Sequence, residues 1–325
     1  MSNIDRLSLA LDDIDIGTGP IGIFNAQPRL IYEQLRGASF QQKMKPLYDR
    51  ALRMGLVEDA GGELQIALVE ITRNKVETQG IIAEAYGRLV EGGILILNGD
   101  KSDGIESHLK AVRKLLGVEQ VISKAHGKVF WLQKTGTPEI FEEWIGQAQA
   151  SVNLDGFTTK PGVFSSEHID NGSYFLNECL PPLSGRVADL GAGWGYLAQA
   201  ALGAHAEITS FDLIEADAVA LACAQENVKD PRAVFHWADA LEFQAEPYDW
   251  ILMNPPFHQS RKKDENLGKA FIQAASRLLH QGGELWMVAN RQLAYEDSLK
   301  SCFATGEILH QSPQYKIIRA GKPRG

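Results

Sequence analysis

The four residues Asn254-Pro255-Pro256-Phe257 have the clearest chemical potential in this chain. They follow the apolar run of residues 250–253, which predicts a buried strand, and the prolines end that strand because they lack a backbone N–H and have a fixed φ. The residue before a proline is pushed into an extended conformation. Asn254 is therefore expected to be a rigid polar group at the carboxyl end of a strand, the edge where open α/β sheets bind ligands. Its side-chain oxygen and the carbonyl of Pro255 are acceptors that suit an exocyclic amino group.

A glycine-rich turn, G-A-G-W-G, places Gly191, Gly193 and Gly195 directly after the predicted strand of residues 186–190. A helix is predicted to follow over residues 196–202. Glycine in such a turn lets the backbone bend sharply and lets a ligand approach closely. A G-x-G turn is a weak signal by itself, because such turns are common. Asp189 stands just before the turn and could meet an ammonium group.

Two carboxylates follow the next two predicted strands. Asp212 ends the predicted strand of residues 207–211, about 20 residues after the glycine turn begins, which is the spacing of a carboxylate that accepts hydrogen bonds from ribose hydroxyls. Asp239 follows the predicted strand of residues 233–237 and could accept from an adenine amino group. Either residue could instead be a helix N-cap. A glycine turn with a ribose carboxylate fits a dinucleotide or S-adenosylmethionine, and the lack of the third glycine of a G-x-G-x-x-G turn favours S-adenosylmethionine.

Strands alternate with helices along the second half, which predicts an α/β fold with a mostly parallel, doubly wound sheet. Further elements expected there are helices over residues 217–227 and 266–279, a strand over 284–288, and a closing antiparallel hairpin of residues 307–310 and 315–319. The first half shows the same alternation more weakly. Its expected strands cover residues 21–25, 64–71, 94–98 and 128–132, and its expected helices cover 47–54, 78–89 and 107–116.

The two halves share one short pattern, because E-G-G-I-L-I-L at residues 91–97 resembles Q-G-G-E-L-W-M at residues 281–287. Duplication of one Rossmann-like fold and chance similarity of a common turn explain this pattern equally well. The first half has no G-x-G turn after its opening strand. We place the domain boundary beside Pro138. Residues 1–138 would form a degenerate domain of similar pattern that binds substrate or supports its neighbour, and residues 139–325 the domain that carries the glycine turn and the catalytic residues.

Composition sets limits on partners and location. Of the 325 residues 44% are hydrophobic, which is enough for a sizeable core, and no apolar run or leader indicates a membrane span or a signal peptide. The three cysteines are far apart, which argues against a disulfide framework or metal site and fits a reducing cytoplasm. The net charge of −9 argues against a simple nucleic-acid-coating protein. Basic clusters at residues 261–263 and 316–324 fit either solvated surface or a rim that contacts phosphates.

These motifs together resemble a known family. The sequences D-L-G-A-G-W-G, F-D-L and N-P-P-F-H, with an acidic residue after the third strand, are similar to class I S-adenosylmethionine-dependent methyltransferases that act on exocyclic or amide nitrogens. The segments at residues 162–165, 168–173, 282–285 and 288–290 narrow the resemblance to the ribosomal small subunit methyltransferase C family. The motif match covers residues 155–320, and the first half matches in size and element order. This chain departs from the commoner pattern at Ala192, which replaces Cys, and at the bulky Trp194.

The resemblance implies transfer of a methyl group from S-adenosylmethionine to the N2 amine of a guanine in 16S ribosomal RNA, within the small ribosomal subunit. Asn254 and Pro255 would accept hydrogen bonds from the amine, and Phe257 would stack on the base. A lid would form from Phe164, Ser165 and residues 170–173. The chain is expected to act as a monomer, and neither His168 nor His258 is assigned a catalytic role. The expected cofactor-binding residues are Asp189, Gly191, Gly193, Gly195, Asp212, Asp239 and Asn254, with no metal ligand.

Other activities fit parts of the same pattern. A sister family that methylates guanine N2 in 23S ribosomal RNA shares most of these motifs. Methyltransferases of protein glutamine N5 also carry Asn-Pro-Pro-aromatic, more often with tyrosine. A nicotinamide-dependent dehydrogenase and a non-catalytic RNA-binding protein remain alternatives from other classes. The residues alone leave this choice open, because residues 254–257 suit adenine, glutamine and guanine alike.

Overall fold

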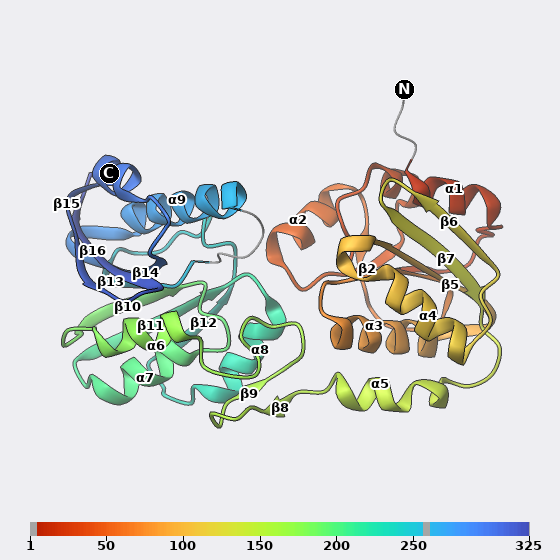
Figure 1. The fold of residues 1–325 in the computed structure, drawn as a ribbon, viewed down its shortest axis with the longest axis horizontal. Helices are drawn as coiled ribbons and strands as arrows, with labels where there is room; N and C mark the ends of the chain where they lie inside the picture. Colours follow the sequence, from red (N-terminus) through yellow and green to blue (C-terminus); the bar gives the residue numbers. More distant parts are fainter. Residues whose placement is uncertain (1–4, 256–260, 325) are drawn as a thin grey trace. The chain divides into compact units, whose positions relative to one another are not determined.

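The computed structural model describes residues 5–255 and 261–324, with the backbone alone for residues 261–265. Contacts divide the chain into two compact units, Met1–Gln149 and Ala150–Gly325 (Figure 1). This division falls later than the boundary expected beside Pro138. Phe141 and Trp144 belong to the core of the first unit, where Phe141 packs edge-on against Tyr86 with ring centroids 5.1 Å apart. The connecting helix is therefore part of the first unit.

The second unit is built on a seven-stranded sheet with strand order β12-β11-β10-β13-β14-β16-β15. Its first five strands are parallel to their neighbours, and β16 pairs antiparallel with β14 and β15. The doubly wound sheet and the closing hairpin predicted from the sequence are confirmed. The strands are β10 (Gly185–Leu190), β11 (Ile208–Glu215), β12 (Ala233–Trp237), β13 (Tyr248–Met253), β14 (Leu279–Asn290), β15 (Phe303–Gln311) and β16 (Tyr315–Pro323).

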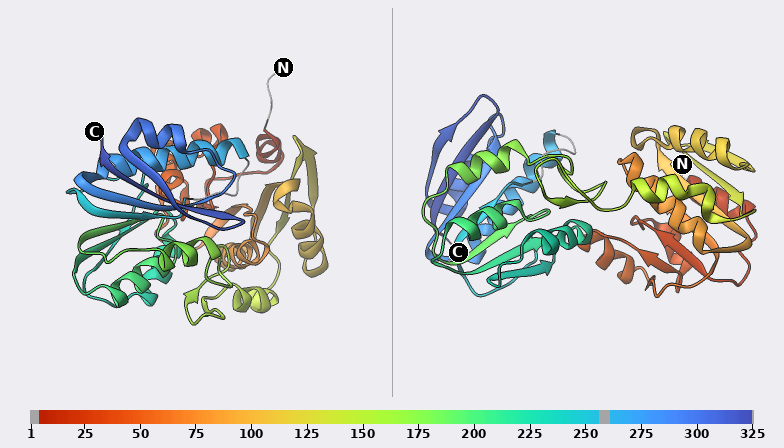
Figure 2. Two further views of the ribbon diagram at one scale, coloured as in Figure 1. Left: turned by 60° about the vertical axis from the view of Figure 1, so that its left-hand side comes forward. Right: turned by 90° about the horizontal axis from the view of Figure 1, so that it is seen from below.

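Helices cover both faces of this sheet (Figures 1 and 2). One face buries apolar side chains of α9 and α10, and the other buries those of α6, α7 and α8. Because both faces are covered, the last residues of β10 and β13, 187–190 and 251–253, are buried without alternation, as expected of central parallel strands. The helices are α6 (Asn171–Glu178), α7 (Tyr196–Ala204), α8 (Ala218–Asn227), α9 (Arg261–Leu278) and α10 (Glu296–Cys302), and a short hairpin of β8 (Ser151–Val152) and β9 (Thr158–Thr159) precedes them.

The first unit repeats this architecture, with a seven-stranded sheet of order β3-β2-β1-β4-β5-β7-β6. Its strands are β1 (Ile21–Phe24), β2 (Ser39–Gln41), β3 (Val57–Glu58), β4 (Leu64–Glu70), β5 (Leu89–Asp100), β6 (Gln120–Lys124) and β7 (Gly127–Gln133). Its helices are α1 (Arg6–Asp13), η1 (Leu30–Leu35), α2 (Lys45–Arg53), α3 (Lys75–Arg88), η2 (Lys101–Asp103), α4 (Ile105–Leu115), η3 (Pro138–Phe141) and α5 (Glu142–Gln147). The two tandem Rossmann-like sheets expected from the sequence are therefore confirmed.

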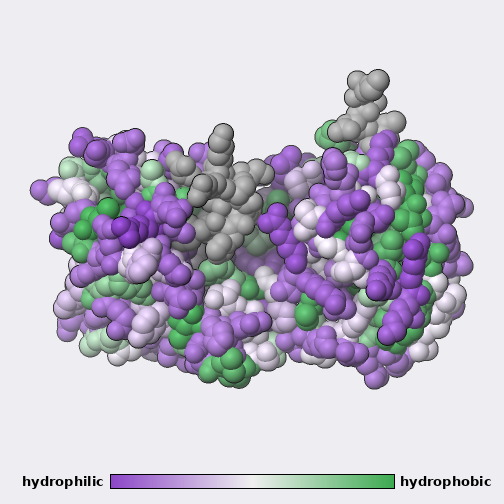
Figure 3. Space-filling model, in the orientation of Figure 1, coloured by the Kyte–Doolittle hydropathy of each residue, from purple (hydrophilic) through white to green (hydrophobic). Residues whose placement is uncertain are grey.

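The glycine pairs that hinted at duplication occupy the same place in both sheets. A Cβ on Gly93 would lie 3.0 Å from the carbonyl oxygen of Gln65, and one on Gly283 would lie 2.7 Å from that of Tyr248. In each unit the glycine thus lets the helix-to-strand turn pass close to the neighbouring strand. No helix within the described ranges is long and apolar enough to cross a membrane. Figure 3 shows one face of the molecule, on which hydrophilic side chains predominate over both units.

Candidate active site

A pocket lies at the carboxyl edge of the second sheet, where β10 and β13 end. The space within it, counted together with the open solvent at its mouth, is about 410 Å³. The sequence-predicted residues Asp189, Gly191, Gly193 and Asn254 all line it, although three different segments of the chain supply its walls. The complete lining is Phe164, Ser165, Asp170, Ser173, Asp189, Gly191, Ala192, Gly193, Trp194, Tyr196, Leu197 and Asn254.

The glycine turn has the backbone conformation that its sequence requires. Gly191, Gly193 and Gly195 have φ values of 82°, 56° and 90°, a region that favours glycine. A Cβ on Gly195 would lie 2.9 Å from Val228 Cγ2, so this glycine lets helix α7 pack closely. A Cβ on Gly193 would have no atom within 4 Å among the described residues, so this backbone borders open space. The turn thus leaves room for a ligand where a side chain would otherwise project.

Asp189, the last-but-one residue of β10, is a buried carboxyl with one oxygen unused. Its side chain is buried, and Oδ1 has no hydrogen-bond partner within the part of the chain that the structure describes. Burial, and secondarily the charge of Glu215, raises the pKa of Asp189 to about 8. Since buried polar atoms are nearly always paired, this oxygen marks a place for a donor or cation supplied by a ligand.

The carboxylate at the end of the second strand is Glu215, and not Asp212 as the sequence suggested. Strand β11 runs on to Glu215, so Asp212 lies inside the sheet and does not line the pocket. Asp212 accepts hydrogen bonds from Tyr248 Oη at 2.6 Å and faces His236 Nε2 at 3.1 Å. Burial alone would raise the pKa of Asp212, but His236 and Tyr248 hold it below its ordinary value. Asp212 is therefore a buried structural carboxylate.

Glu215 has the position at the end of the strand that was expected of Asp212, although it is not among the residues that line the pocket. Its Oε2 accepts from the backbone N–H of Gly193 at 2.7 Å, and its Oε1 accepts from Asp217 N at 2.8 Å. Burial raises the pKa of this carboxyl. Glu215 therefore ties the glycine turn to the end of β11. The sequence signal that identifies it is the apolar pair Leu213-Ile214, which continues the strand past Asp212.

Asp239 follows β12, as predicted, and caps the next turn. Its Oδ1 accepts from Leu241 N at 2.9 Å, and its carbonyl accepts from Glu242 N and Phe243 N. Asp239 does not line the pocket described above. Asp239 thus caps a turn and not a helix, so the helix N-cap that the sequence left open is not observed, and adenine recognition by Asp239 stays a prediction.

Asn254 lies directly after β13 with its side chain fixed by two contacts. Its Nδ2 donates to Asp170 Oδ2 at 2.7 Å and to Ser173 Oγ at 2.8 Å. Both hydrogens of the amide nitrogen are thereby used, which leaves Oδ1 as the atom that Asn254 can present to a ligand. Pro255 follows and is buried. Phe257, with its predicted stacking role, and His258 lie outside the described residues.

The segment expected to form a lid supplies one wall of the pocket through Phe164, Ser165, Asp170 and Ser173. Trp194 of the glycine turn holds this wall, because its indole Nε1 donates to the carbonyl oxygen of Phe164 at 3.0 Å. Trp194 is 4% exposed, and its hydrogen bond fixes the glycine turn to this wall.

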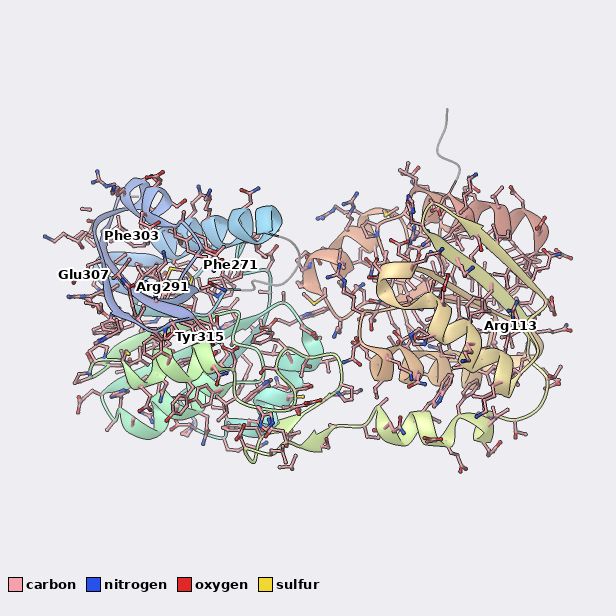
Figure 4. All side chains as sticks on the ribbon, viewed as in Figure 1. Arg113, Phe271, Arg291, Phe303, Glu307 and Tyr315 are labelled. Carbon is pink, nitrogen blue, oxygen red and sulfur yellow. The ribbon has the colours of Figure 1, made fainter. Side chains whose placement is uncertain are left out.

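Two aromatic side chains lie close to segments that form the walls of the pocket. Phe271 of α9 would lie 3.6 Å from a Cβ on Gly191, and Tyr315 of β16 would lie 3.2 Å from a Cβ on Gly172. Figure 4 labels both, together with Arg291, which follows β14 at the same edge of the sheet and is exposed. One aromatic side chain thus lies close to the glycine turn and another close to the start of α6, although neither is among the residues that line the pocket.

Known proteins resemble this chain in sequence and fold. The family model described as the methyltransferase small domain matches residues 155–319. The ribosomal RNA small subunit methyltransferase C of Shewanella oneidensis is 31% identical over 240 residues, which cover 72% of this chain and 70% of that protein. The protein of the same name from Psychromonas ingrahamii is 29% identical over 264 residues, 79% of this chain and 75% of its own length.

A solved structure has the same fold over nearly the whole chain. It is the 16S rRNA N2 methyltransferase of T. thermophilus in complex with AdoMet and guanosine. Its TM-score is 0.79 at 24% sequence identity, and the match covers 98% of this chain and 92% of that one.

Proposed function

This chain belongs to the ribosomal RNA small subunit methyltransferase C family, and we propose that it transfers a methyl group from S-adenosylmethionine to the exocyclic N2 amine of a guanine in 16S ribosomal RNA. The observation that carries this proposal is the meeting of two groups in one pocket. Asp189 has a buried oxygen with no partner among the residues that the structure describes, and Asn254 has an amide oxygen held as an acceptor. One suits the cationic donor and the other suits the accepting amine.

The residues of the pocket fit S-adenosylmethionine, which supplies a methyl group activated by the positive charge on its sulfur. Asp189 would hold the ammonium group, and the open backbone at Gly193 leaves room for the donor to lie against the turn. Glu215, at the end of β11, would accept hydrogen bonds from the ribose hydroxyls. Asp239 remains our candidate for the adenine amino group.

The amine would be held by acceptors at the end of β13. Guanine N2 is a poor nucleophile because its lone pair is delocalised into the ring. Asn254 Oδ1 and the Pro255 carbonyl would accept its two N–H groups and favour a tetrahedral nitrogen. As positive charge develops on that nitrogen, both hydrogen bonds strengthen, so the two acceptors bind the transition state more tightly than the substrate. A paired or stacked guanine has to be flipped out to reach such a pocket, and Phe257 is our candidate stacking face.

The proposed substrate also implies where the enzyme acts and in what form. The enzyme would act as a monomer on the small ribosomal subunit in the cytoplasm, where that RNA is assembled. The first unit would bind substrate or support the second unit, since the turn that follows its opening strand lacks the G-x-G pattern.

The test uses the full chain, labelled S-adenosylmethionine, and purified small and large subunits from cells that lack the gene. We expect label in the small-subunit RNA, which digestion and chromatography should identify as N2-methylguanosine. Free 16S ribosomal RNA, assayed beside the particle, shows which form is the substrate. Label confined to large-subunit RNA, or to a protein glutamine, would contradict the proposal and support one of the sister activities.

A further inference from the structure

We propose that Asp170 is a positioning residue for this reaction, acting through Asn254 to fix and polarise the amide that receives the substrate amine. This inference rests on the proposed function of the same pocket. It assigns a reaction role to a residue that lies far from Asn254 in the sequence and precedes the glycine turn.

The contacts of Asn254 permit one orientation of its amide. Asp170 Oδ2 lies 2.7 Å from Nδ2 of Asn254, and Ser173 Oγ lies 2.8 Å from the same nitrogen. A carboxylate only accepts hydrogen bonds, so the atom that faces it has to be the amide nitrogen. A flipped amide would place its oxygen against the carboxylate of Asp170, which is repulsive. Asp170 therefore decides which end of the Asn254 amide is offered to the substrate.

Asp170 is itself held by the start of α6. It is the N-cap of that helix, and the same oxygen that accepts from Asn254 also accepts from Ser173 N at 2.8 Å. A Cβ on Gly172 would lie 3.0 Å from this oxygen and 3.2 Å from Tyr315 Cε1. The carboxylate is thus positioned by the helix backbone, with glycine as the residue that leaves it space.

The charge of Asp170 adds to this geometric effect. A carboxylate that accepts from the N–H of an amide draws positive charge toward the nitrogen and makes the amide oxygen a stronger acceptor, because hydrogen bonds in a chain polarise one another. A stronger acceptor matters most when the amine becomes positively charged, which occurs in the transition state. Loss of Asp170 should therefore lower kcat while the cofactor affinity is retained.

Two substitutions separate the contributions of geometry and charge. Asp170→Ser keeps a good N-cap for α6 but is too short to reach Asn254, and we expect kcat to fall roughly 10- to 100-fold, the effect of losing a hydrogen bond to a charged group. Asp170→Asn keeps one oxygen that can accept from both Ser173 N and Asn254 Nδ2, but it has no charge. We expect it to restore most of the geometry, so its kcat should exceed that of Asp170→Ser by several fold.

Asp5→Ser is a matched control, because Asp5 caps an eight-residue helix of the first unit just as Asp170 caps the eight-residue α6. The control should keep the kcat of the unsubstituted chain. All variants should bind S-adenosylmethionine within about threefold of the unsubstituted chain by calorimetry.

Two outcomes would overturn the positioning role. One is an unchanged kcat in Asp170→Ser. The other is equal losses of kcat in both Asp170 variants with matching losses of cofactor affinity, which would indicate a purely structural effect. Failure of the proposed function is a separate result, because the unsubstituted chain would then methylate no guanine in small-subunit RNA.

Discussion

The two sheets have the same strand order but differ at their carboxyl edges. The edge of the second sheet forms a pocket, whereas the edge of the first is filled by side chains of its own unit. Their registers align the two units residue by residue, since Ile66 of β4 pairs with the residue after Gly93 and Trp250 of β13 pairs with the residue after Gly283. Counting along the strands then places Glu70 where the second unit has Asn254. By the same register Ile23 stands in the place of Asp189.

The first unit fills this edge with its own side chains. Glu70 is 1% exposed and accepts from Tyr32 Oη at 2.7 Å, from Asn98 Nδ2 at 2.7 Å and from both Nε and a terminal nitrogen of Arg29. Arg6 of α1 donates in turn to Asn98 Oδ1 at 2.7 Å. Burial alone would lower the pKa of Arg29, but the charge and hydrogen bonds of Glu70 raise it above its ordinary value.

The difference shows how one fold gives either a binding site or an edge that is filled by its own side chains. In the second unit Asp189 Oδ1 has no hydrogen-bond partner among the described residues, whereas at the equivalent edge of the first unit both oxygens of Glu70 have internal partners. Buried polar groups are normally satisfied, so the edge that carries the unsatisfied carboxyl is the one that needs a ligand. The comparison predicts that substitutions at equivalent positions have different effects, on stability in the first unit and on chemistry in the second.

The largest effect is expected from Glu70→Ala. Removing this carboxylate deprives the partly buried Arg29 and the fully buried Asn98 of the acceptor they share, and breaking such a pair costs about 3–5 kcal/mol of unfolding free energy. Thermal unfolding should show a clearly lowered transition. Affinity for S-adenosylmethionine, measured by calorimetry below that transition, should stay within about twofold. A marked loss of affinity in a folded Glu70→Ala protein would contradict the division of roles between the two edges.

At the equivalent position Asn254→Ala should abolish most of the methyl transfer. Removing a group that stabilises developing charge typically lowers kcat by about 10²–10³-fold. Radiolabel transfer to small subunits measures kcat, and calorimetry should show cofactor affinity within a fewfold of the unsubstituted chain. Retained turnover would remove Asn254 from the catalytic site.

Substitutions of the two carboxylates of β11, Asp212 and Glu215, should also have different effects. Glu215→Gln should weaken cofactor binding roughly 10-fold, in line with the loss of charge-assisted hydrogen bonds to ribose hydroxyls. Asp212→Asn disturbs contacts to Tyr248 and His236, so it should lower the thermal transition more than the cofactor affinity. Calorimetry and thermal unfolding on both variants check this assignment. The reverse pattern would restore the ribose role to Asp212.

A proton linked to Asp189 also distinguishes the two edges. Its pKa of about 8 in the folded chain exceeds the ordinary value of 3.8, so the folded state binds more protons between these pH values. Unfolding free energy should therefore fall as pH rises from about 4 to about 8, and Asp189→Asn should lack this contribution.

Cofactor binding provides the matching measurement for Asp189. A cationic donor beside this carboxyl lowers its pKa, so binding at pH 7 should release up to about one proton. Calorimetry in two buffers of different ionisation enthalpy measures that proton, and Asp189→Asn should release close to none. Equal proton release by the two proteins would place the ammonium group elsewhere.

Local sequence patterns predicted the parts of the site that local structure determines. The glycine turn, the strand before it and the position of Asn254 after β13 follow from spacing, proline and glycine, which act within a few residues of themselves. The resemblance to the methyltransferase family also identified the wall formed by Phe164, Ser165 and Asp170.

What sequence reasoning missed depends on contacts between distant residues. Asp212 was expected to end its strand, but it lies inside the sheet, where its partners His236 and Tyr248 come from 24 and 36 residues away in the chain. At the filled edge of the first unit, Arg29 and Tyr32 likewise donate to Glu70, which lies 41 and 38 residues away from them in the chain. No periodicity reports such pairings, since they are fixed by the register of the sheet.

The indole of Trp194 gives the pocket an optical reporter. It is one of six tryptophans in the chain, and its ring nitrogen holds the carbonyl of Phe164 across the entrance of the glycine turn. Any ligand that moves the turn changes the polarity around this ring and therefore its emission. The difference spectrum between the unsubstituted chain and Trp194→Phe would isolate that signal, so arrival of the cofactor can be followed in real time without a label.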